Sequence, residues 1–342
     1  MEENRTQRVE TMGGETGPRY VVGVDLGGTK IFAAVFDPHL EIVGKAKRST
    51  KPKRGVDQVL DRIAQTVLDA VDESDLALDD VVAVGIGAPG AMDPNEGVVL
   101  FAPNLYWRDV ALTKELEKRL GRPVYADNDC NVQVLGIHAK ELGGRPQNLV
   151  GIFIGTGIGA GLILNGTLYH GYNRTAGEIG HMVLQVDGPK CSCGNRGCFE
   201  ALASRTAIME RIKAEVKKGV PTLLYELTGG DLDKIRSGDL KKAIKKGDAL
   251  TKRIIKETAV YIGIAVANVI NLLSPEYVIL GGGVIEALED RMMDTIEETA
   301  RKYAMKGTVK GVKIQASSLG DRAGVVGAAV LARQKLQEQT GE

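Results

Sequence analysis

A cluster of metal-ligating residues lies between Gly177 and Glu200, a segment that holds three of the four cysteines and one of the four histidines. Three thiolates and one imidazole suit a closed tetrahedral zinc site, whose first task is structural. A disulfide cluster is the alternative, but two cysteines separated by one residue bridge each other poorly, and nothing in the sequence indicates secretion. The sequence therefore predicts a zinc site. Its expected ligands are His181, Cys191, Cys193 and Cys198, spaced His-x9-Cys-x-Cys-x4-Cys.

Two carboxylates stand next to these ligands in the chain. Glu178 precedes His181 by three residues, and Glu200 follows Cys198 by two. Fixing the ligands would also fix both carboxylates, and a carboxylate offers several acceptor sites to O–H donors. We therefore expect the two glutamates and the imidazole to hold neighbouring hydroxyls of a sugar. The alternative is that both glutamates are simply solvated.

A glycine turn follows the first apolar run of the chain. A β-branched strand ends at Asp25, and the segment 20–45 predicts a three-stranded meander. Glycine backbone can approach a phosphate closely, a neighbouring hydroxyl and ammonium add donors, and Asp25 could hold Mg²⁺. A single Gly-Gly turn is usually only a hairpin. The candidate nucleotide-binding residues here are Asp25, Gly27, Gly28, Thr29 and Lys30.

The same pattern recurs from Leu149, about 130 residues further on, which suggests an internal duplication. Two βββαβαβ halves facing each other would bring both glycine turns to one cleft and form a nucleotide clamp. A third glycine run, after a strand at 276–280, could lie against adenine and ribose, although it matches no GxGxxG fingerprint. The candidate nucleotide-binding residues of these two turns are Gly155, Thr156, Gly157, Gly159, Gly281, Gly282 and Gly283.

Acidic residues lie at the end of another predicted strand, VYADND. Strand periodicity places Asp127 and Asp129 on one face and Asn128 on the other. An aspartate in a cleft can accept the proton of an attacking alcohol, and such a general base contributes roughly 10²–10⁴ in rate. Spacing does not decide which aspartate is the base, and one of the two is expected to cap the next helix, from Asn131 to Leu142.

Two further loops contain candidate sugar contacts. The loop Gly87, Ala88, Pro89, Gly90 follows the buried strand VVAVGI, at the carboxyl end where α/β folds place ligands. Asn104 can both donate to and accept from a hydroxyl, although a structural turn asparagine is equally compatible with the sequence. Periodicity predicts helices over 56–73, 204–218, 250–273 and 324–336, a helical insertion up to 248 and a strand over 312–316.

Composition excludes several classes of protein. The chain has 342 residues and a net charge of zero, so it has no basic field for nucleic acid. The uncharged stretch 149–173 contains five closely spaced glycines, which predict strands and turns rather than a membrane span. Residues 1–19 have no apolar core of a signal peptide and are expected to form a flexible tail. We expect a cytoplasmic protein with no membrane partner.

Taken in order, these motifs resemble those of one family. They are Asp25-x-Gly-Gly-Thr-Lys30, Gly-x-Pro-Gly at 87–90, Pro103-Asn104, Asn128-Asp129, the turn at 156–161, GEIGH and CxCGxxGCxE. The chain resembles the ROK family (repressors, open reading frames, kinases) over about residues 21–333, most closely its bacterial and archaeal glucokinases. The resemblance implies the actin-like ATPase fold, in which two RNase H-like α/β domains flank an active-site cleft. We expect a small domain at 20–135, with a helix of about 324–342 packed back on it, and a large domain at 136–323 that carries the zinc loop.

The resemblance also implies ATP- and Mg²⁺-dependent phosphorylation of the 6-hydroxyl of glucose. It assigns the general base to Asp129 and leaves Asp127 in support. The implied sugar contacts are the backbone of Gly87 to Gly90 and the residues Asn104, Asn128, Asp129, Glu178, His181 and Glu200. His181 would bind zinc through one ring nitrogen and face the sugar with the other. We also expect a homo-oligomer, a dimer or tetramer.

The resemblance leaves alternatives. Fructose, mannose or an N-acetylhexosamine could replace glucose, and ADP or polyphosphate could replace ATP. The family also includes sugar-responsive repressors, but the neutral charge argues against DNA binding. A chaperone or filament ATPase of the same fold would leave the cysteine cluster and Asn128-Asp129 unexplained.

Overall fold

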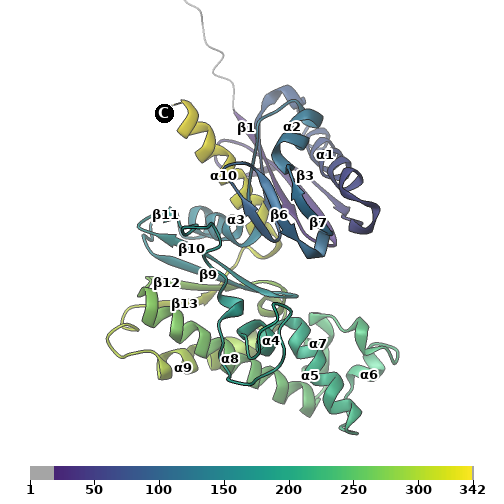
Figure 1. The fold of residues 1–342 in the computed structure, drawn as a ribbon, viewed down its shortest axis with the longest axis vertical. Helices are drawn as coiled ribbons and strands as arrows, with labels where there is room; N and C mark the ends of the chain where they lie inside the picture. Colours follow the sequence, from purple (N-terminus) through teal and green to yellow (C-terminus); the bar gives the residue numbers. More distant parts are fainter. Residues whose placement is uncertain (1–18, 341–342) are drawn as a thin grey trace, which may run out of the picture.

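The computed structural model describes residues 19–340, so the tail expected at 1–19 lies almost wholly outside the described residues. An upper lobe contains a five-stranded sheet in the order β3-β2-β1-β4-β8 (Figure 1). The first three strands form the expected antiparallel meander, and β4 and β8 run parallel to β1. The strands are β1 (Tyr20–Leu26), β2 (Lys30–Phe36), β3 (Ile42–Ser49), β4 (Val81–Ala88) and β8 (Val124–Asn128).

A lower lobe contains a second sheet with the equivalent order, β11-β10-β9-β12-β13. Its first three strands are again antiparallel neighbours, and β12 and β13 again run parallel to the first strand of the set. This repeated topology confirms the predicted duplication. The strands are β9 (Leu149–Ile154), β10 (Ile158–Leu164), β11 (Thr167–Leu168), β12 (Tyr277–Gly281) and β13 (Lys313–Ala316).

The register of the upper sheet aligns the residues expected to do chemistry. Asp25 on β1 pairs with Gly87 on β4, and Gly87 pairs with Asp127 on β8. The carboxyl ends of three parallel strands therefore meet at one edge of the sheet, where α/β proteins bind ligands. The first glycine turn, the 87–90 loop and the Asn128-Asp129 pair all follow directly from that edge.

The helix after β8 begins earlier than the sequence suggested. Helix α3 spans Asp129–Gly136 and continues as the π-helical segment Ile137–Glu141. Asn128 is its N-cap, and the Asn128 side chain accepts from the backbone N–H groups of Cys130 and Asn131. The expected start at Asn131 was wrong, as was the shared strand face of Asp127 and Asp129, because the capping asparagine starts the helix two residues sooner. The expected boundary between the small domain (20–135) and the large domain (136–323) falls inside this helix. That boundary stays a prediction.

The remaining helices of the upper lobe cover its sheet. Helix α1 (Val56–Asp72) packs on β2 and β3, while α10 (Ala323–Thr340) crosses the opposite face over β1 and β4. Helix α2 (Leu112–Leu120) contacts α1 and β8. A small antiparallel sheet lies between β4 and α2, formed by β5 (Ala91–Asp93), β6 (Val98–Ala102) and β7 (Trp107–Val110).

Helices α4 to α9 belong to the lower lobe (Figure 1). Helix α8 is long and apolar enough to cross a membrane, but 61% of that window is buried, and it packs along α9 as a core helix does. The segment predicted as a helical insertion contains α6 and α7. The bounds are α4 (Phe199–Ala203), α5 (Arg205–Lys217), α6 (Leu224–Leu227), α7 (Ser237–Lys245), α8 (Ala249–Leu273) and α9 (Gly283–Tyr303).

Glycines let α10 lie directly on the backbone of its neighbours. A Cβ atom at Gly85 would lie 1.8 Å from the carbonyl oxygen of Ala328, and one at Gly23 would lie 1.9 Å from that of Val325. At Gly327 it would lie 1.6 Å from the carbonyl oxygen of Val132 on α3. No side chain can occupy these contacts, so the separation of α10 from the upper sheet and from α3 is set by backbone alone.

Gly85→Ala should therefore destabilise the protein by about 3 kcal/mol or more, because the new methyl group overlaps a backbone oxygen that cannot turn away. The matched control is Gly238→Ala on α7, where nothing lies within 4 Å of the added carbon and the change should be neutral or stabilise by up to about 1 kcal/mol. Urea unfolding measures both. A wild-type midpoint for Gly85→Ala would contradict this packing.

Candidate active site

The first glycine turn is held rigidly between β1 and β2. The Gly27 N–H donates to the carbonyl of Lys30 at 2.8 Å, and the buried Thr50 hydroxyl donates to the carbonyl of Gly27 at 2.6 Å. The Thr50 N–H also donates to the carbonyl of Thr29, at 3.0 Å. A Cβ atom at Gly28 would lie 3.4 Å from the Cβ of Asn104, so the predicted phosphate turn and the predicted sugar asparagine are neighbours.

The second glycine turn is fastened by the start of α5. The Gly155 N–H donates to the carbonyl of Gly157 at 2.9 Å, and the Arg205 N–H donates to the carbonyl of Gly155 at 2.9 Å. The Arg205 guanidinium also donates to the Thr156 hydroxyl, at 2.8 Å. Sequence reasoning missed Arg205, because nothing in its local pattern shows that it lies beside a turn 49 residues earlier.

The third glycine run lies beside the second. Gly281 pairs with Phe153 on β9, the strand that leads into the second turn. Gly282, at a φ of 85°, caps α9, and a Cβ atom there would lie 2.6 Å from the carbonyl of Ile154. Gly283 has open space around it. The two glycine turns of the lower lobe therefore lie side by side.

Three carboxylates interact at the junction of the lobes. Burial raises the pKa of Asp25 to about 7, with the neighbouring charge of Asp129 adding to the effect and Lys30 opposing it. Burial likewise raises the pKa of Asp129 to about 6; the Cys130 N–H, which donates to its carboxylate at 2.9 Å, lowers it, and the charge of Glu178 raises it. Raised carboxyl pKa values that cluster in this way are typical of catalytic sites.

Lys30 was expected to face phosphate, and in the structure its ammonium forms an ion pair with Asp321 at 2.6 Å. Lys47 reaches the same carboxylate at 3.5 Å. Asp321 lies just before α10, and its side chain is 60% exposed. The pair therefore contributes little to stability, and the ammonium remains accessible to an anion.

Asn128 joins the 87–90 loop to the start of α3. Its amide nitrogen donates to the carbonyl of Gly90 at 3.1 Å, while its amide oxygen caps the helix. Gly90 has a φ of 96° and packs against the backbone of Phe101. A Cβ atom at Gly87 would lie 3.5 Å from the Cα of Asp129, so the loop and the backbone of the predicted base are neighbours.

The predicted zinc ligands lie together. One donor atom from each of His181, Cys191, Cys193 and Cys198 lies within 4.8 Å of the others. The Sγ atoms of Cys193 and Cys198 are 3.7 Å apart, as are the Sγ of Cys191 and the Nδ1 of His181. All cysteines of the described residues are free, so the disulfide alternative is wrong here. Edges near 3.7 Å match a tetrahedron with metal–sulfur bonds of about 2.3 Å.

The two glutamates differ in their surroundings. Glu178 Oε2 lies 3.8 Å from the Nε2 of His181, the ring nitrogen opposite the one that faces Cys191. Glu200 accepts from the N–H of Ile158 at 2.9 Å and from the hydroxyl of Ser192 at 3.3 Å. Glu200 is therefore not simply solvated, because it connects residues 191–198, the cysteine loop, to the second glycine turn.

Asp127 is separated from Asp129 by the start of α3 and has its own partners. Its carboxylate accepts from the amide of Asn131 at 2.9 Å and contacts the Nε2 of His170 at 2.6 Å. His170 was missed by sequence reasoning, because it lies in a segment without a motif and meets its partner only through the fold.

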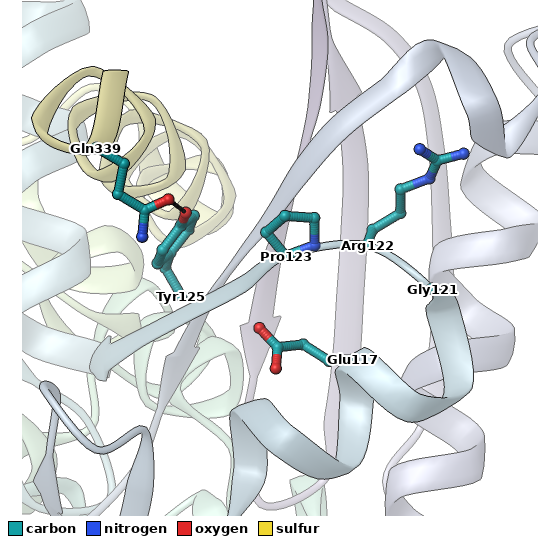
Figure 2. A pocket seen from close by; sticks show the side chains of 6 residues that line it. All are labelled: Glu117, Gly121, Arg122, Pro123, Tyr125 and Gln339. Carbon is teal, nitrogen blue, oxygen red and sulfur yellow. Dashed lines mark hydrogen bonds between the residues drawn. The ribbon is translucent and has the colours of Figure 1, made fainter. Parts of the chain in front are cut away.

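A separate hollow lies at the opposite end of β8 (Figure 2). The Tyr125 hydroxyl donates to Gln339 at 2.8 Å, and Glu117 accepts from the N–H of Val124 at 3.1 Å. Its lining residues are Glu117, Gly121, Arg122, Pro123, Tyr125 and Gln339. None of the predicted site residues lines this hollow.

The duplicated sheets, with a glycine turn after the first strand of each and carboxylates beside both turns, define a protein of the actin-like ATPase class. The sequence matches the model of the ROK family over residues 21–335. The chain belongs to the ROK family.

Relatives include the glucokinase of Thermotoga maritima, which is 36% identical over 92% of this chain and 98% of that protein. The crystal structure of a ROK family glucokinase from Streptomyces griseus, in complex with glucose and AMPPNP, is 35% identical. It has a TM-score of 0.80 and covers 93% of this chain and 100% of its own. The xylose repressor of Bacillus subtilis is 30% identical over 90% of this chain and 75% of that protein.

Replacing Asp25 by Asn should stabilise the ligand-free protein at neutral and alkaline pH. The folded-state pKa of Asp25, about 7, exceeds the ordinary 3.8, so the stability that this group contributes is fully present below about pH 4. It is lost as the pH rises through 7. The gain from Asp25→Asn, on the order of 1–3 kcal/mol, should be larger at pH 8 than at pH 5.

Thermal unfolding at the two pH values measures this gain. The control is Asp57→Asn on α1, whose carboxylate is 87% exposed, and its effect should not depend on pH. Equal shifts of Asp25→Asn at pH 5 and pH 8 would contradict the raised pKa.

Proposed function

We propose that this chain is a glucokinase that transfers the terminal phosphoryl group of ATP to the 6-hydroxyl of glucose, with Asp129 as the general base. The observation that carries the proposal is the position of Asp129, which is the first residue of α3 and lies close enough to Asp25 to raise the Asp25 pKa and close enough to Glu178 to have its own pKa raised. The similarity to glucokinases over nearly the whole chain supports the same activity.

Asp129 would act as the proton acceptor. Its ionised carboxylate takes the proton of the 6-hydroxyl, the hydroxyl oxygen bonds to the γ-phosphorus, and the bond from that phosphorus to the β-bridging oxygen breaks, which releases ADP. Because the pKa of Asp129 is about 6, the carboxylate is mostly ionised at neutral pH and more basic than an ordinary aspartate. Phosphoryl transfer otherwise needs positioning and charge neutralisation.

The sugar would lie between the lobes at the carboxyl edge of the upper sheet. The backbone of Gly87 to Gly90 would form the floor, with Asn104 and Asn128 on the upper side. Glu178, His181 and Glu200 would hold hydroxyls from the lower side. The hydrogen bond from Asn128 to Gly90 and the contact of Gly28 with Asn104 support this arrangement.

ATP would span the glycine turns of both lobes. Gly27 to Lys30 and the run Gly155, Thr156, Gly157 and Gly159 would face the phosphates, and Gly281 to Gly283 would lie against adenine and ribose. Mg²⁺ would come with the nucleotide and be held through Asp25, directly or through water. Bound Mg²⁺ would favour the ionised form of Asp25, whose pKa is raised without it.

Zinc would be held by His181, Cys191, Cys193 and Cys198, whose donor atoms are compatible with tetrahedral coordination. It would stabilise the cysteine loop and act on the reaction only through orientation. With Nδ1 directed at the metal, the Nε2 of His181 is left beside Glu178 to meet the sugar. We also propose a cytoplasmic homo-oligomer.

A sugar-responsive regulator is the second candidate, because a xylose repressor is 30% identical over most of this chain. The net charge of zero argues against DNA binding. A coupled assay over a panel of hexoses and phosphoryl donors distinguishes the kinase from the regulator. Turnover of glucose with ATP supports the kinase; negligible glucose turnover with a gel shift at low salt would support the regulator.

Asp129→Asn should lower kcat by roughly 10²–10⁴-fold, because the variant cannot accept a proton. Glucose affinity, measured by calorimetry, should stay within a few-fold of wild type. Asp57→Asn serves as the control and should leave both unchanged. Near-wild-type turnover of Asp129→Asn would rule out the base assignment.

The pH profile provides an independent check on the same base. Activity requires ionised Asp129, so kcat/KM for glucose should fall as the pH drops below about 6. With an ordinary aspartate as the base, kcat/KM would fall only near pH 3.8, about two pH units lower. A flat profile between pH 7 and pH 5 would contradict the raised pKa.

Cys193→Ala should remove zinc and raise the KM for glucose by roughly 10-fold or more, because Glu200 and His181 lose their support. Metal content and kinetics are measured on the same preparation. Wild-type protein treated with a chelator and then given zinc back is the control. Unchanged kinetics in metal-free protein would show that the loop and the sugar site are independent.

A further inference from the structure

A short hydrogen bond crosses between the two lobes next to the candidate base. The Nε2 of His170 lies 2.6 Å from the Oδ2 of Asp127. Asp127 belongs to β8 of the upper sheet and its side chain is 3% exposed, while His170 follows β11 of the lower sheet and is 31% exposed. A buried carboxylate needs hydrogen-bond donors, and this one takes a donor from the opposite lobe.

The other oxygen of Asp127 holds the start of α3. Oδ1 accepts from the N–H of Asn128 at 2.7 Å and from the amide of Asn131 at 2.9 Å. These residues flank Asp129 on both sides. Movement of the Asp127 carboxylate would therefore move the cap of α3 and the carboxylate that follows it. The third donor, from His170, fixes the remaining oxygen.

The segment that contains His170 leads directly into Glu178. Residues 169–177, the connecting loop, are closed by a hydrogen bond from the Ala176 N–H to the His170 carbonyl at 3.0 Å. A second bond ties this loop to the upper lobe, where the Arg174 guanidinium donates to Asp93 on β5 at 2.8 Å. The connecting loop thus touches the upper lobe at two points and ends at a predicted sugar contact of the lower lobe.

We propose that His170 is a positioning residue for the reaction. It acts through Asp127 on Asn128 and Asp129, and through its own loop on Glu178. Its hydrogen bond to Asp127 fixes the position of the base, Asp129, relative to Glu178, the predicted sugar contact of the opposite lobe. This inference rests on the proposed kinase function and adds to it a residue outside the sugar, nucleotide and metal sets.

The experiment compares replacements of His170 that differ in reach. The Gln amide can place its nitrogen near the position of Nε2, whereas the shorter Asn amide cannot. Measured with glucose and ATP, His170→Ala and His170→Asn should lower kcat by on the order of 10²-fold, the loss expected for a small misplacement of a base. His170→Gln should recover most of that loss. The KM for ATP should stay within about two-fold of wild type in all three variants, because the hydrogen bonds described for Asp127 lead to His170 and to the start of α3 and not to the glycine turns.

Tyr172→Ala is the matched control in the same connecting loop. The Tyr172 side chain is fully exposed, so kcat and KM should both be unchanged. Thermal unfolding of each variant shows whether it is folded at the assay temperature. The Asn and Gln variants keep the test valid if the Ala variant fails to fold, because both retain a polar side chain of related size.

A double mutant tests whether the effect passes through the base. In the Asp129→Asn background, measured at saturating glucose, adding His170→Ala should change the residual kcat by less than about two-fold, because there is no base left to position and saturation offsets any weaker binding of the sugar by Glu178. A full further 10²-fold loss in the double mutant would contradict the proposal. A wild-type kcat for His170→Ala would also contradict it. Equal losses of kcat in His170→Asn and His170→Gln would contradict it as well. Wild-type turnover of glucose and its loss in Asp129→Asn test the kinase function separately, so a failure of this inference alone would be recognisable.

Discussion

The way the two lobes are joined depends on close backbone contact between α10, α3 and the upper sheet. Gly23 and Gly85 admit the backbone of α10 onto β1 and β4, and Gly327 admits α3 onto α10. Helix α3 in turn packs on β9 and β10 of the lower lobe. A Cβ atom at Gly324, in the first turn of α10, would lie 2.9 Å from the carboxyl carbon of Asp25. The same contacts that join the lobes therefore also bury the carboxylates whose pKa values are raised, so stability and chemistry share one constraint.

Duplication explains why each half has a glycine turn after its first strand, and the differences between the halves explain how each turn is held. The first turn is held by Thr50 and followed by Lys30, whose ammonium pairs with Asp321, just before α10. The second turn has no lysine and is fastened by Arg205 and by Glu200, which accepts from Ile158 directly after it. Glu200 also contacts Ser192 of the cysteine loop. The second glycine turn and the cysteine loop of the lower lobe are therefore parts of one hydrogen-bonded unit.

Local patterns in the sequence were sufficient for much of the fold. Alternation and glycine turns predicted both meanders, and the strand order confirms the duplication. The spacing of His181 and the three cysteines predicted donor atoms that the structure brings within 4.8 Å. The start of α3 was misplaced, because Asn128 was weighed as a ligand and not as a helix cap. The partners His170 and Asp127, 43 residues apart, and Lys30 and Asp321, 291 residues apart, could not be predicted. Such pairs are set by how the two sheets meet, which local spacing does not encode.

In the proposed reaction Asp129 faces the hydroxyl that receives the phosphoryl group, while the cysteine loop positions the neighbouring Glu178 and Glu200 toward the rest of the sugar. A crystal structure with glucose and a non-hydrolysable ATP analogue tests this arrangement most directly. We expect the 6-hydroxyl within hydrogen-bond distance of the Asp129 carboxylate, with other hydroxyls bound by Glu178, His181 and Glu200. A sugar ring bound away from the cysteine loop, or a 6-hydroxyl directed away from Asp129, would contradict it.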